Sequence, residues 1–593
     1  MKSIIYLTFF CTLTGFATQL NAQTYSIHQN NGFDPFTREL YKPGVNLHSS
    51  IKPYRLDEIN NYYSTDSLIQ RGLYKPSERV NIFKSNKERE KLNFFQRFIH
   101  DDLFSWEDKN DGIFIRINPL ANFEIGKELS ESKNIWVNTR GLMIEGNLGK
   151  NLSFYGDVYE NQAVYPQYLD NDIRERYVVP GQGRAKLYGD DGRGFDFSQS
   201  NGYVSYNAGQ WINLQLCFGK NFIGDGYRSL LLSDNANSYG HIKMTATFMK
   251  IKYWWMIAQF QHYGKERDFN HVGVDRFPYK YGAFHYLDWN IGKRISFGVF
   301  ESVMWTENDE AGGRGVDLSY LNPFVFYRPI EFGAGSPDNM LVGANLKIIA
   351  WKDAALYGQL IFNEFKLDEL RSDKKWWGNK YGFQIGLKSY NFLGINNLEA
   401  QTEYNQVRPY TYSHYGVDYV NQSSQKITYP VSNYYGHANQ ELMHPLGSNF
   451  KENVSILRYR YKRWHIELKN MIAIHGKDKN FAETIKIKSD PDVYKTWIVS
   501  YGGDIFKSCE DRWGVIDRSY GNEIGQGIKT NILNFSGEIS WLVNPKTNMN
   551  IAIGGRYRKQ SNEQGDNFDK YENVNKLFYI TLRTSLRNFY YDF

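Results

Sequence analysis

Apolar and polar residues alternate along most of the chain from about residue 130 onward. The segment 533–541 carries Leu, Phe, Gly, Ile and Trp at every second position, with Asn, Ser and Glu between them, and 152–159, 242–248 and 551–558 repeat the pattern. In 253–260 both faces are apolar. A period of two predicts strands with one apolar and one polar face. We therefore predict an all-β fold, which this pattern alone leaves open between a sandwich and a barrel.

Residues 23–128 have a different pattern and predict a small, partly helical domain on the periplasmic side. Ser85 can cap a helix that runs to Leu103, because the apolar residues between them recur at helical spacing. A second short helix is predicted over 57–73. Alternation begins at 113–118, and we place the start of the β-barrel at residue 129.

The first 22 residues have the features of a secretory signal. Lys2 supplies the positive n-region, and the apolar h-region that follows is too short to cross a bilayer as a helix. We predict cleavage after Ala22. Cys11 lies inside the h-region without the small residues that precede a lipoprotein cysteine. The signal predicts export from the cytoplasm, in an organism whose envelope has an outer membrane.

Composition favours a membrane barrel over a soluble protein. Aromatic residues make up 17% of the chain although mean hydropathy is −0.57. After the signal, no run approaches the ~18 apolar residues of a membrane helix, whereas transmembrane barrels combine aromatic girdles with alternating strands. The net charge of +6 includes no long basic block, which argues against a nucleic-acid partner. Cys217 and Cys509 allow one optional disulfide in the mature chain.

The C-terminus favours the barrel over the sandwich. Residues 578–586 alternate, the phase slips once, and Phe589, Tyr591 and Phe593 then follow at every second position. An aromatic end of this kind resembles the signal read by the outer-membrane barrel-assembly machinery. We predict a last strand that seals against the first and carries Phe593 at its end, leaving no free sheet edge. Chain length allows about 16 to 22 strands, and single-chain barrels favour even numbers.

No motif indicates catalysis, a cofactor or a metal. The Gly-rich segment 521–530 lacks the Gly directly before Lys that a phosphate loop needs, because Ile528 intervenes. His437 and His444 fit no metal-ligand spacing. Since no compact motif identifies a nucleophile, we predict a protein that is not an enzyme, and an outer-membrane hydrolase stays as a weaker alternative.

Several long segments resemble the Wzi-like capsule-assembly family of outer-membrane barrels, and within it the gliding-motility branch called RemB. They are WVNTRGLMIEGNLG (136–149), FGKNFIGDGYRSLLLSDNA (218–236), LNPFVFYRPIEFGAGSPDNMLVG (321–343), EYNQVRPYTYSH (403–414), HPLGSNF (444–450) and NLHSSIKPY (46–54). The resemblance implies about 18 strands and a surface role in gliding motility or in attachment and assembly of capsular polysaccharide, with polysaccharide or surface adhesins as partners. A solute channel is the alternative.

Charged and aromatic residues within these segments are our candidates for a polysaccharide track or a lumen network. They are Tyr227, Arg228, Arg328, Glu331, Glu403, Arg408, Tyr410 and Tyr412. Ion pairs in a lumen commonly rigidify a barrel, whereas tyrosine faces can stack on sugar rings. We expect the charged candidates to point into the lumen or loops, because an Arg facing lipid costs ~2–4 kcal/mol. We expect Tyr410 and Tyr412 to be exposed at the outer mouth.

Overall fold

The computed structural model describes most of the chain beyond residue 37. The described residues are 38–55, 58, 93–108, 110–263, 277–309, 312–324, 326–336, 338–414, 418–420, 426–428, 433–478, 483–487, 490–497, 500–507, 519–544, 546–562, 570–584 and 589–593. The predicted signal peptide, almost all of the predicted helix over 57–73, and Cys509 lie outside them.

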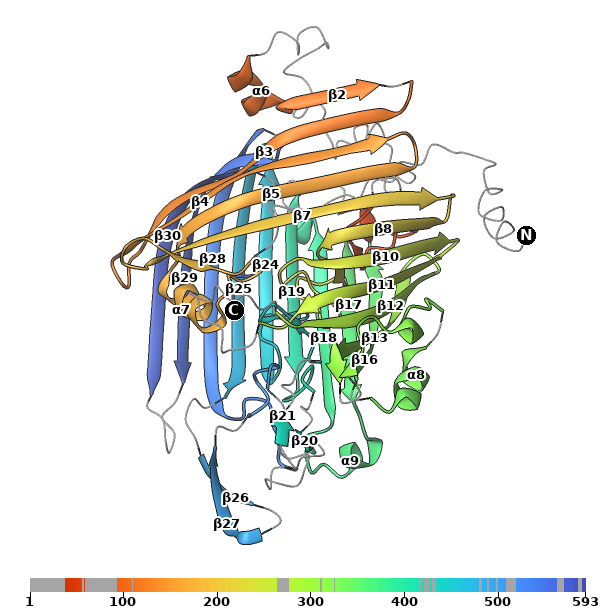
Figure 1. The fold of residues 1–593 in the computed structure, drawn as a ribbon. Helices are drawn as coiled ribbons and strands as arrows, with labels where there is room; N and C mark the ends of the chain where they lie inside the picture. Colours follow the sequence, from red (N-terminus) through yellow and green to blue (C-terminus); the bar gives the residue numbers. More distant parts are fainter. Residues whose placement is uncertain are drawn as a thin grey trace, which may run out of the picture.

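A closed antiparallel barrel dominates the described residues, as the alternation predicted (Figure 1). Its 18 strands follow one another in chain order. They are β3 (Ile113–Glu128), β4 (Lys133–Leu148), β5 (Leu152–Val164), β7 (Gly194–Ala208), β8 (Ile212–Gly219), β10 (Tyr239–Phe248), β11 (Ile251–Gln261), β12 (Tyr279–Ile291), β13 (Ile295–Thr306), β16 (Asn339–Trp351), β17 (Ala354–Glu364), β18 (Lys380–Tyr390), β19 (Leu398–Val407), β24 (Phe450–Tyr461), β25 (Trp464–Lys477), β28 (Ile528–Asn544), β29 (Met549–Asn562) and β30 (Tyr571–Arg583). The ring closes where β30 pairs with β3, from Asn122↔Arg583 to Glu128↔Leu577.

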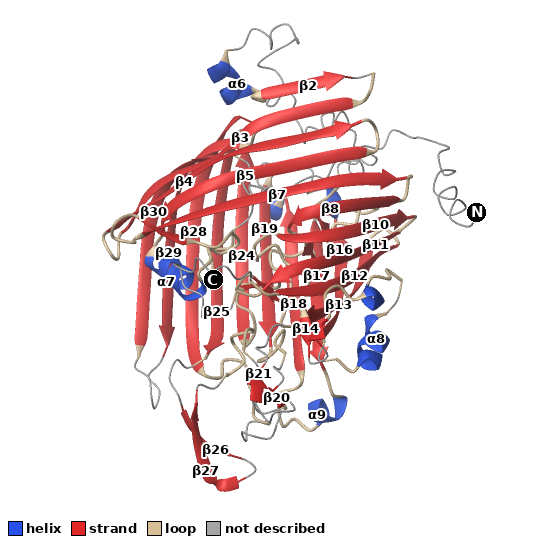
Figure 2. Cartoon of the chain, viewed as in Figure 1, coloured by secondary structure: helices blue, strands red, loops and turns tan. Residues whose placement is uncertain are grey.

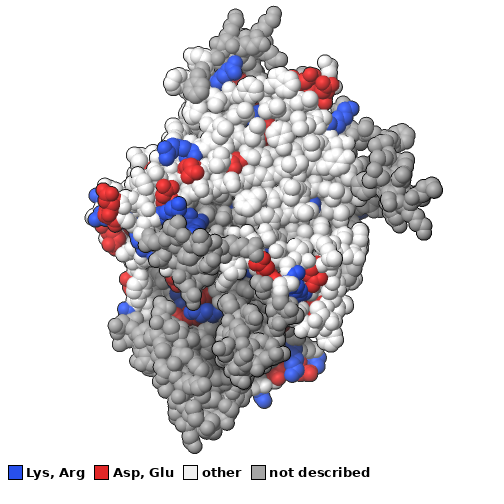
Figure 3. Space-filling view, viewed as in Figure 1, with Lys and Arg blue, Asp and Glu red and all other residues white. Residues whose placement is uncertain are grey.

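The alternation in sequence becomes an inner and an outer face of the wall. On β28, Phe535 and Ile539 are exposed on the outside, whereas Asn534 and Ser540 are buried. The front wall in Figure 3 accordingly shows few charged side chains over the strands. This arrangement is the lipid-facing belt of a transmembrane barrel, whose polar residues turn to the lumen.

The two ends of the barrel differ in the length of their connections. Short turns such as 149–151, 249–250 and 462–463 occupy one end, and long connections such as 220–238 and 408–449 occupy the other. In outer-membrane barrels the short turns are periplasmic and the long loops extracellular. We therefore orient the long-loop end, at the bottom of Figure 1, toward the outside of the cell.

The barrel sheet begins earlier than the boundary at residue 129 that we expected. β2 (Phe104–Asp108) pairs with the first part of β3, so both strands belong to the sheet. Residues 38–55 do not stand apart from the barrel either: β1 (Ile51–Lys52) pairs with β9 (Phe222–Ile223), and His48 lies 2.6 Å from Asp288 of β12. Of the helix predicted from Ser85 to Leu103, the structure describes α6 (Phe94–His100).

In the described part of the chain the helices are short (Figure 2). Besides α6 they are α7 (Gln167–Arg176), α8 (Tyr327–Ala334), α9 (Leu367–Arg371) and the 3-10 turns η2 (Glu39–Tyr41), η3 (Leu318–Tyr320) and η4 (Phe392–Gly394). The short strand β6 (Lys186–Tyr188) pairs with the barrel strand β7. The loops also contain small hairpins, formed by β14 (Asn308–Asp309) and β15 (Gly312–Gly313), β20 (Asp418–Val420) and β21 (Lys426–Thr428), β22 (Gly436–His437) and β23 (Gln440–Glu441), and β26 (Glu483–Ile487) and β27 (Asp490–Trp497). Among the described residues, no helix has the length and apolar character needed to span a bilayer.

The end of the chain corrects our expectation for Phe593. β30 stops at Arg583, and residues 589–593 lie inside the barrel instead of extending the sealing strand. The reason is the length of the neighbouring strand. β29 begins at Met549, and its pairing with β30 ends at Asn550↔Arg583. Pairing with β29 therefore ends at Arg583, Thr584 still donates its N–H to Ala121 of β3, and the described residues 589–593 have their partners in the lumen.

Candidate functional site

A partition built from four chain segments crosses the lumen. We define this lumen partition as residues 165–185 with α7, residues 220–238, residues 433–449 and the C-terminal tail 589–593. The segments bind one another: Arg176 of α7 contacts Glu441 at 2.8 Å, and Gly181 donates its N–H to the Gln440 side chain at 2.6 Å. Segments far apart in sequence therefore form one structure inside the barrel.

Arg228 is the central charge of the lumen partition and is fully buried. Its guanidinium contacts Glu452 at 3.0 Å and Asp592 at 3.1 Å, and it lies over the rings of Tyr227 and Tyr590. A buried cation is tolerated only when it is paired in this way. Arg228 thus joins the 220–238 segment to the wall and to the C-terminal tail.

Asp592 is held from three directions. Besides Arg228, it contacts Lys469 of β25 at 3.2 Å and accepts a hydrogen bond from the Tyr227 hydroxyl at 2.7 Å. Burial alone would raise the pKa of Asp592, but Arg228 and Lys469 outweigh burial and keep the pKa below its ordinary value. The carboxylate is therefore charged at neutral pH and anchors the tail.

Glu403 also binds the 220–238 segment to the barrel wall. Its carboxylate, on the inner face of β19, accepts the backbone N–H groups of Tyr227 at 2.7 Å and Arg228 at 2.9 Å. Arg408, another of our candidates, donates to the carbonyls of Asn379 at 2.9 Å and Trp376 at 3.2 Å. Arg228 and Glu403 thus lie in the lumen and Arg408 in a loop, as we expected for charged residues.

Tyr410 and Tyr412 are not available to a sugar. Both rings are buried, with exposed fractions of 1% and 0%. The Tyr410 hydroxyl donates to the carbonyl of Ser500 at 3.0 Å, and that of Tyr412 to the carbonyl of Leu230 at 2.9 Å. Our expectation that they form an exposed stacking surface is therefore wrong, because the segment after β19 folds into the mouth instead of projecting from it.

Arg328 and Glu331 are also outside the network that we expected in the lumen. They lie on α8, on the outside of the wall, and form an ion pair of 2.7 Å with each other. Because the connection between β13 and β16 turns outward, neither residue reaches the lumen partition.

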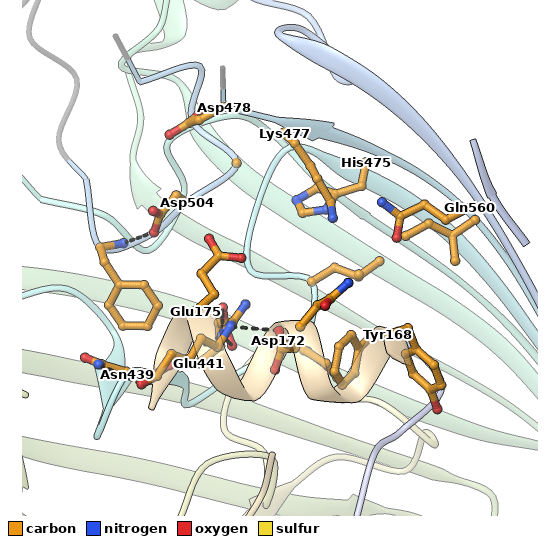
Figure 4. Close-up of a pocket in the computed structure, with 18 of the residues that line it drawn as sticks. Tyr168, Asp172, Glu175, Asn439, Glu441, His475, Lys477, Asp478, Asp504 and Gln560 are labelled. Carbon is orange, nitrogen blue, oxygen red and sulfur yellow. Dashed lines mark hydrogen bonds and ion pairs between the residues drawn. The ribbon is translucent and has the colours of Figure 1, made fainter. Parts of the chain in front are cut away.

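A large cavity lies on the extracellular side of the lumen partition (Figure 4). Its volume is about 930 Å³. Its floor includes α7 and Phe593, and its walls include the extracellular ends of β25, β28, β29 and β30. Aromatic or imidazole rings at the lining come from Tyr168, His262, Tyr263, His475, Phe506, Tyr571 and Phe593. We call this space the outer cavity.

Many of the side chains that line the outer cavity are charged, and some of them form ion pairs with one another. Arg176 pairs with Asp172 at 3.1 Å as well as with Glu441, and Lys507 pairs with Asp478 at 3.0 Å. Burial raises the pKa of Asp478, although Lys507 opposes this shift.

Glu175 and Lys477 also contribute to the outer cavity. Glu175 points into this space from α7, and Lys477 points into it from the end of β25 (Figure 4). These two side chains are placed to meet a polar ligand.

Sequence reasoning missed this site. None of our eight candidate residues lines the outer cavity as the structure describes it. The available signal was the segment QYLDNDIRER (167–176), whose charged residues lie between two strands of the predicted barrel. Its position as a floor depends on contacts with residues 439–441 and with the C-terminal tail, which no local pattern reveals.

A second cavity lies on the periplasmic side of the lumen partition. It has a volume of about 270 Å³ and is lined by Tyr591 and by charged wall residues such as Glu124, Arg556 and Arg583. In the described part of the chain, no residue lines both this inner cavity and the outer cavity. The tail separates them, with Phe593 facing the outer cavity and Phe589 and Tyr591 facing the inner one.

Comparison with known proteins gives similar barrels at low identity. No family model and no curated protein matches the sequence. The chain is similar to Wzi of Escherichia coli, an outer-membrane protein involved in group 1 capsule assembly and described as a carbohydrate-binding β-barrel, with 11% identity, a TM-score of 0.49, and coverage of 95% of this chain and 99% of Wzi. It is also similar to OprD of Pseudomonas aeruginosa, with 9% identity, a TM-score of 0.38, and coverage of 79% and 94%.

OpdK of Pseudomonas aeruginosa is a further similar barrel, with 7% identity, a TM-score of 0.39, and coverage of 79% of this chain and 98% of OpdK. Low identity and low TM-scores of this kind carry no argument about the ligand of this chain.

Proposed function

We propose that this protein is a non-enzymatic outer-membrane surface factor that holds extracellular polysaccharide in its outer cavity. It would act in attachment or assembly of capsular polysaccharide or in gliding motility, the roles implied by the sequence segments that resemble the Wzi-like family and its RemB branch. The observation that carries the proposal is a large, ring-lined and charged cavity on the extracellular side of the lumen partition.

The size and lining of the outer cavity suit a segment of a sugar chain. Its volume of about 930 Å³ falls within the ~300–1,000 Å³ of typical ligand pockets. Aromatic faces pack against the apolar faces of sugar rings, and a few polar groups then fix the orientation of the hydroxyls. Tyr263, Phe506 and Tyr571 offer such faces, and Glu175 and Lys477 offer the polar groups.

The charge of the lining suggests which polysaccharides fit best. Carboxylates come from Asp172, Glu175, Glu441, Asp478 and Asp504, and cationic groups from Arg176, Lys477, Lys507 and Arg558. The two signs nearly balance, so the cavity would repel neither a neutral chain nor one that carries both charges. A densely anionic polymer would meet five carboxylates against four cationic groups and would bind less well.

The alternative function, a solute channel, requires a continuous path through the lumen. The lumen partition separates the outer from the inner cavity in the described structure, and buried ion pairs at Arg228 and Asp592 hold it in place. A small conductance in planar bilayers is therefore expected for the purified protein. A large, steady conductance would favour the channel.

Binding of the purified polysaccharide of the producing strain to the protein in detergent tests the proposal. Replacing Phe506 and Lys477 with Ala should weaken binding at least tenfold while the barrel stays heat-modifiable on a gel. Lys462→Ala, in the short turn at the opposite end, is the matched control and should bind normally. Unchanged binding by the double variant would contradict the proposal. Deletion of the gene, scored for retained polysaccharide and for surface spreading, would separate the capsule role from the motility role.

A further inference from the structure

The long connection between β13 and β16 packs on the outside of the barrel. We call residues 312–338, with η3 and α8, the external segment. On β13, Ser302 turns inward and bonds to Tyr435 of the lumen partition at 3.0 Å. Its neighbour Val303 therefore turns outward, and so does Trp305, yet both are fully buried. What buries them is the external segment: Tyr320 and Tyr327 pack with these wall residues in one apolar cluster.

A carboxylate on the outer face of the wall fixes the external segment in place. Glu301 faces outward between Val299, which is exposed, and Val303. Its side chain accepts the backbone N–H groups of Tyr327 at 3.0 Å and Arg328 at 3.3 Å, at the start of α8. The capping residue Phe326 has no side-chain acceptor, so Glu301 caps the helix from the wall. A charged residue that would be costly on a lipid-facing wall thus has a partner in α8.

The external segment extends over the lipid-facing belt. The Tyr253 hydroxyl donates to the carbonyl of Pro323, and the Tyr253 ring stacks on Phe324 at 6.1 Å. Tyr253 is paired with Leu287 of β12, and Leu287 is paired with Val299 of β13. Val299 belongs to the exposed apolar belt, so the segment lies beside residues that contact lipid. Figure 2 shows α8 outside the wall, beside the strands.

The outer surface of the external segment is strongly apolar. Phe324, Phe326 and Phe332 are exposed to 81%, 77% and 82%. Large apolar side chains exposed together mark an interaction surface. Arg328 stands among them, paired with Glu331 and exposed at its head. Aromatic residues with a long cationic side chain are the combination found at a lipid–water boundary, where the cation extends to the headgroups.

We infer that the external segment is a lipid-contacting brace, whose three phenylalanines insert into the lipid beside β11–β13. The occupant is lipid, because the surface continues the lipid-facing belt of the wall without interruption. The brace enlarges the apolar perimeter of the barrel on one side and gives the protein a fixed contact with lipid along β11–β13. This inference does not depend on what the outer cavity binds.

Site-directed spin labelling of the full chain in vesicles of phosphatidylethanolamine and phosphatidylglycerol tests the brace. With Cys217 and Cys509 replaced by serine, a nitroxide is placed at Phe332→Cys. Collision rates are then measured with oxygen, which concentrates in lipid, and with a nickel chelate, which stays in water. Val299→Cys on the belt is the lipid control, and Asp191→Cys in an exposed loop turn is the water control.

We expect the oxygen-to-nickel ratio at residue 332 to match the Val299→Cys control and to exceed the Asp191→Cys control several-fold. A ratio equal to the water control would overturn the inference. Low collision rates with both reagents would overturn it too, and would indicate that protein, such as a second copy of the chain, covers the surface. Phe326→Cys repeats the measurement at a second position, and heat-modifiability on a gel verifies that each labelled barrel is folded.

Discussion

Replacing Asp592 with Asn is the sharpest test of how the lumen is closed. The substitution keeps the size of the side chain and an acceptor for the Tyr227 hydroxyl, but it removes the charge that faces Arg228 at 3.1 Å and Lys469 at 3.2 Å. Arg228 keeps Glu452 as a partner at 3.0 Å, so it is not left alone. The substitution therefore weakens the binding of the tail to the lumen while Arg228 stays paired.

The expected magnitude follows from the burial of the ion pairs. Removing one partner of a buried pair costs about 3–5 kcal/mol, and the remaining Arg228–Glu452 contact places this case at about 3 kcal/mol. That energy shifts the equilibrium between bound and released tail by about 100-fold. The tail separates the two cavities, so its release should join them. Planar-bilayer recordings of Asp592→Asn should show openings that are rare in the unmodified protein.

Glu572→Gln is the matched control, because Glu572 pairs with Lys559 at 2.9 Å on a partly exposed surface. Such surface pairs contribute about 0–1 kcal/mol, so conductance should stay low. Protease cleavage within the tail should likewise be faster for Asp592→Asn than for the control. Wild-type conductance and wild-type cleavage rates in Asp592→Asn would refute the assignment of the tail as the anchored closure.

Three further predictions concern pH, the wall and the external segment. The pKa of Asp592 is lowered below its ordinary value of 3.8, so the charged carboxylate contributes fully to stability above pH ~4, and this contribution is lost as the pH falls further. Release of the tail should therefore increase below pH ~4 in the wild type and should not depend on pH in Asp592→Asn. Ile553→Arg on the lipid-facing side of β29 should destabilise the barrel by ~2–4 kcal/mol in folding titrations, whereas Ile553→Leu should have little effect. Glu301→Ala leaves the first N–H groups of α8 without their acceptor and should cost ~0.5–2 kcal/mol of local stability. The loss should be seen as greater mobility of a nitroxide at residue 332, and an unchanged spectrum would argue against the capping role.

The sequence by itself determined the barrel. Alternation in segments such as 533–541 already assigns which side chains share the apolar face and which share the polar face, because a strand repeats every two residues whatever its neighbours are. The C-terminal aromatic residues and the predicted signal then favoured a barrel over a sandwich. The same local rule placed Phe535 and Ile539 outside and Asn534 inside, as the structure shows. Motifs that resemble a known family supported the strand number, which the closed ring confirms.

Only the tertiary structure decided what fills and surrounds the barrel. Asp592 meets Arg228 across 364 positions of the chain, and Tyr410 is buried by contacts with residue 500, so no local pattern could indicate either contact. The aromatic alternation at the C-terminus suggested a strand, but the end of pairing at Arg583 turned the tail into the lumen. The outer cavity arises from such long-range contacts, because its floor and walls come from segments that are far apart in the sequence.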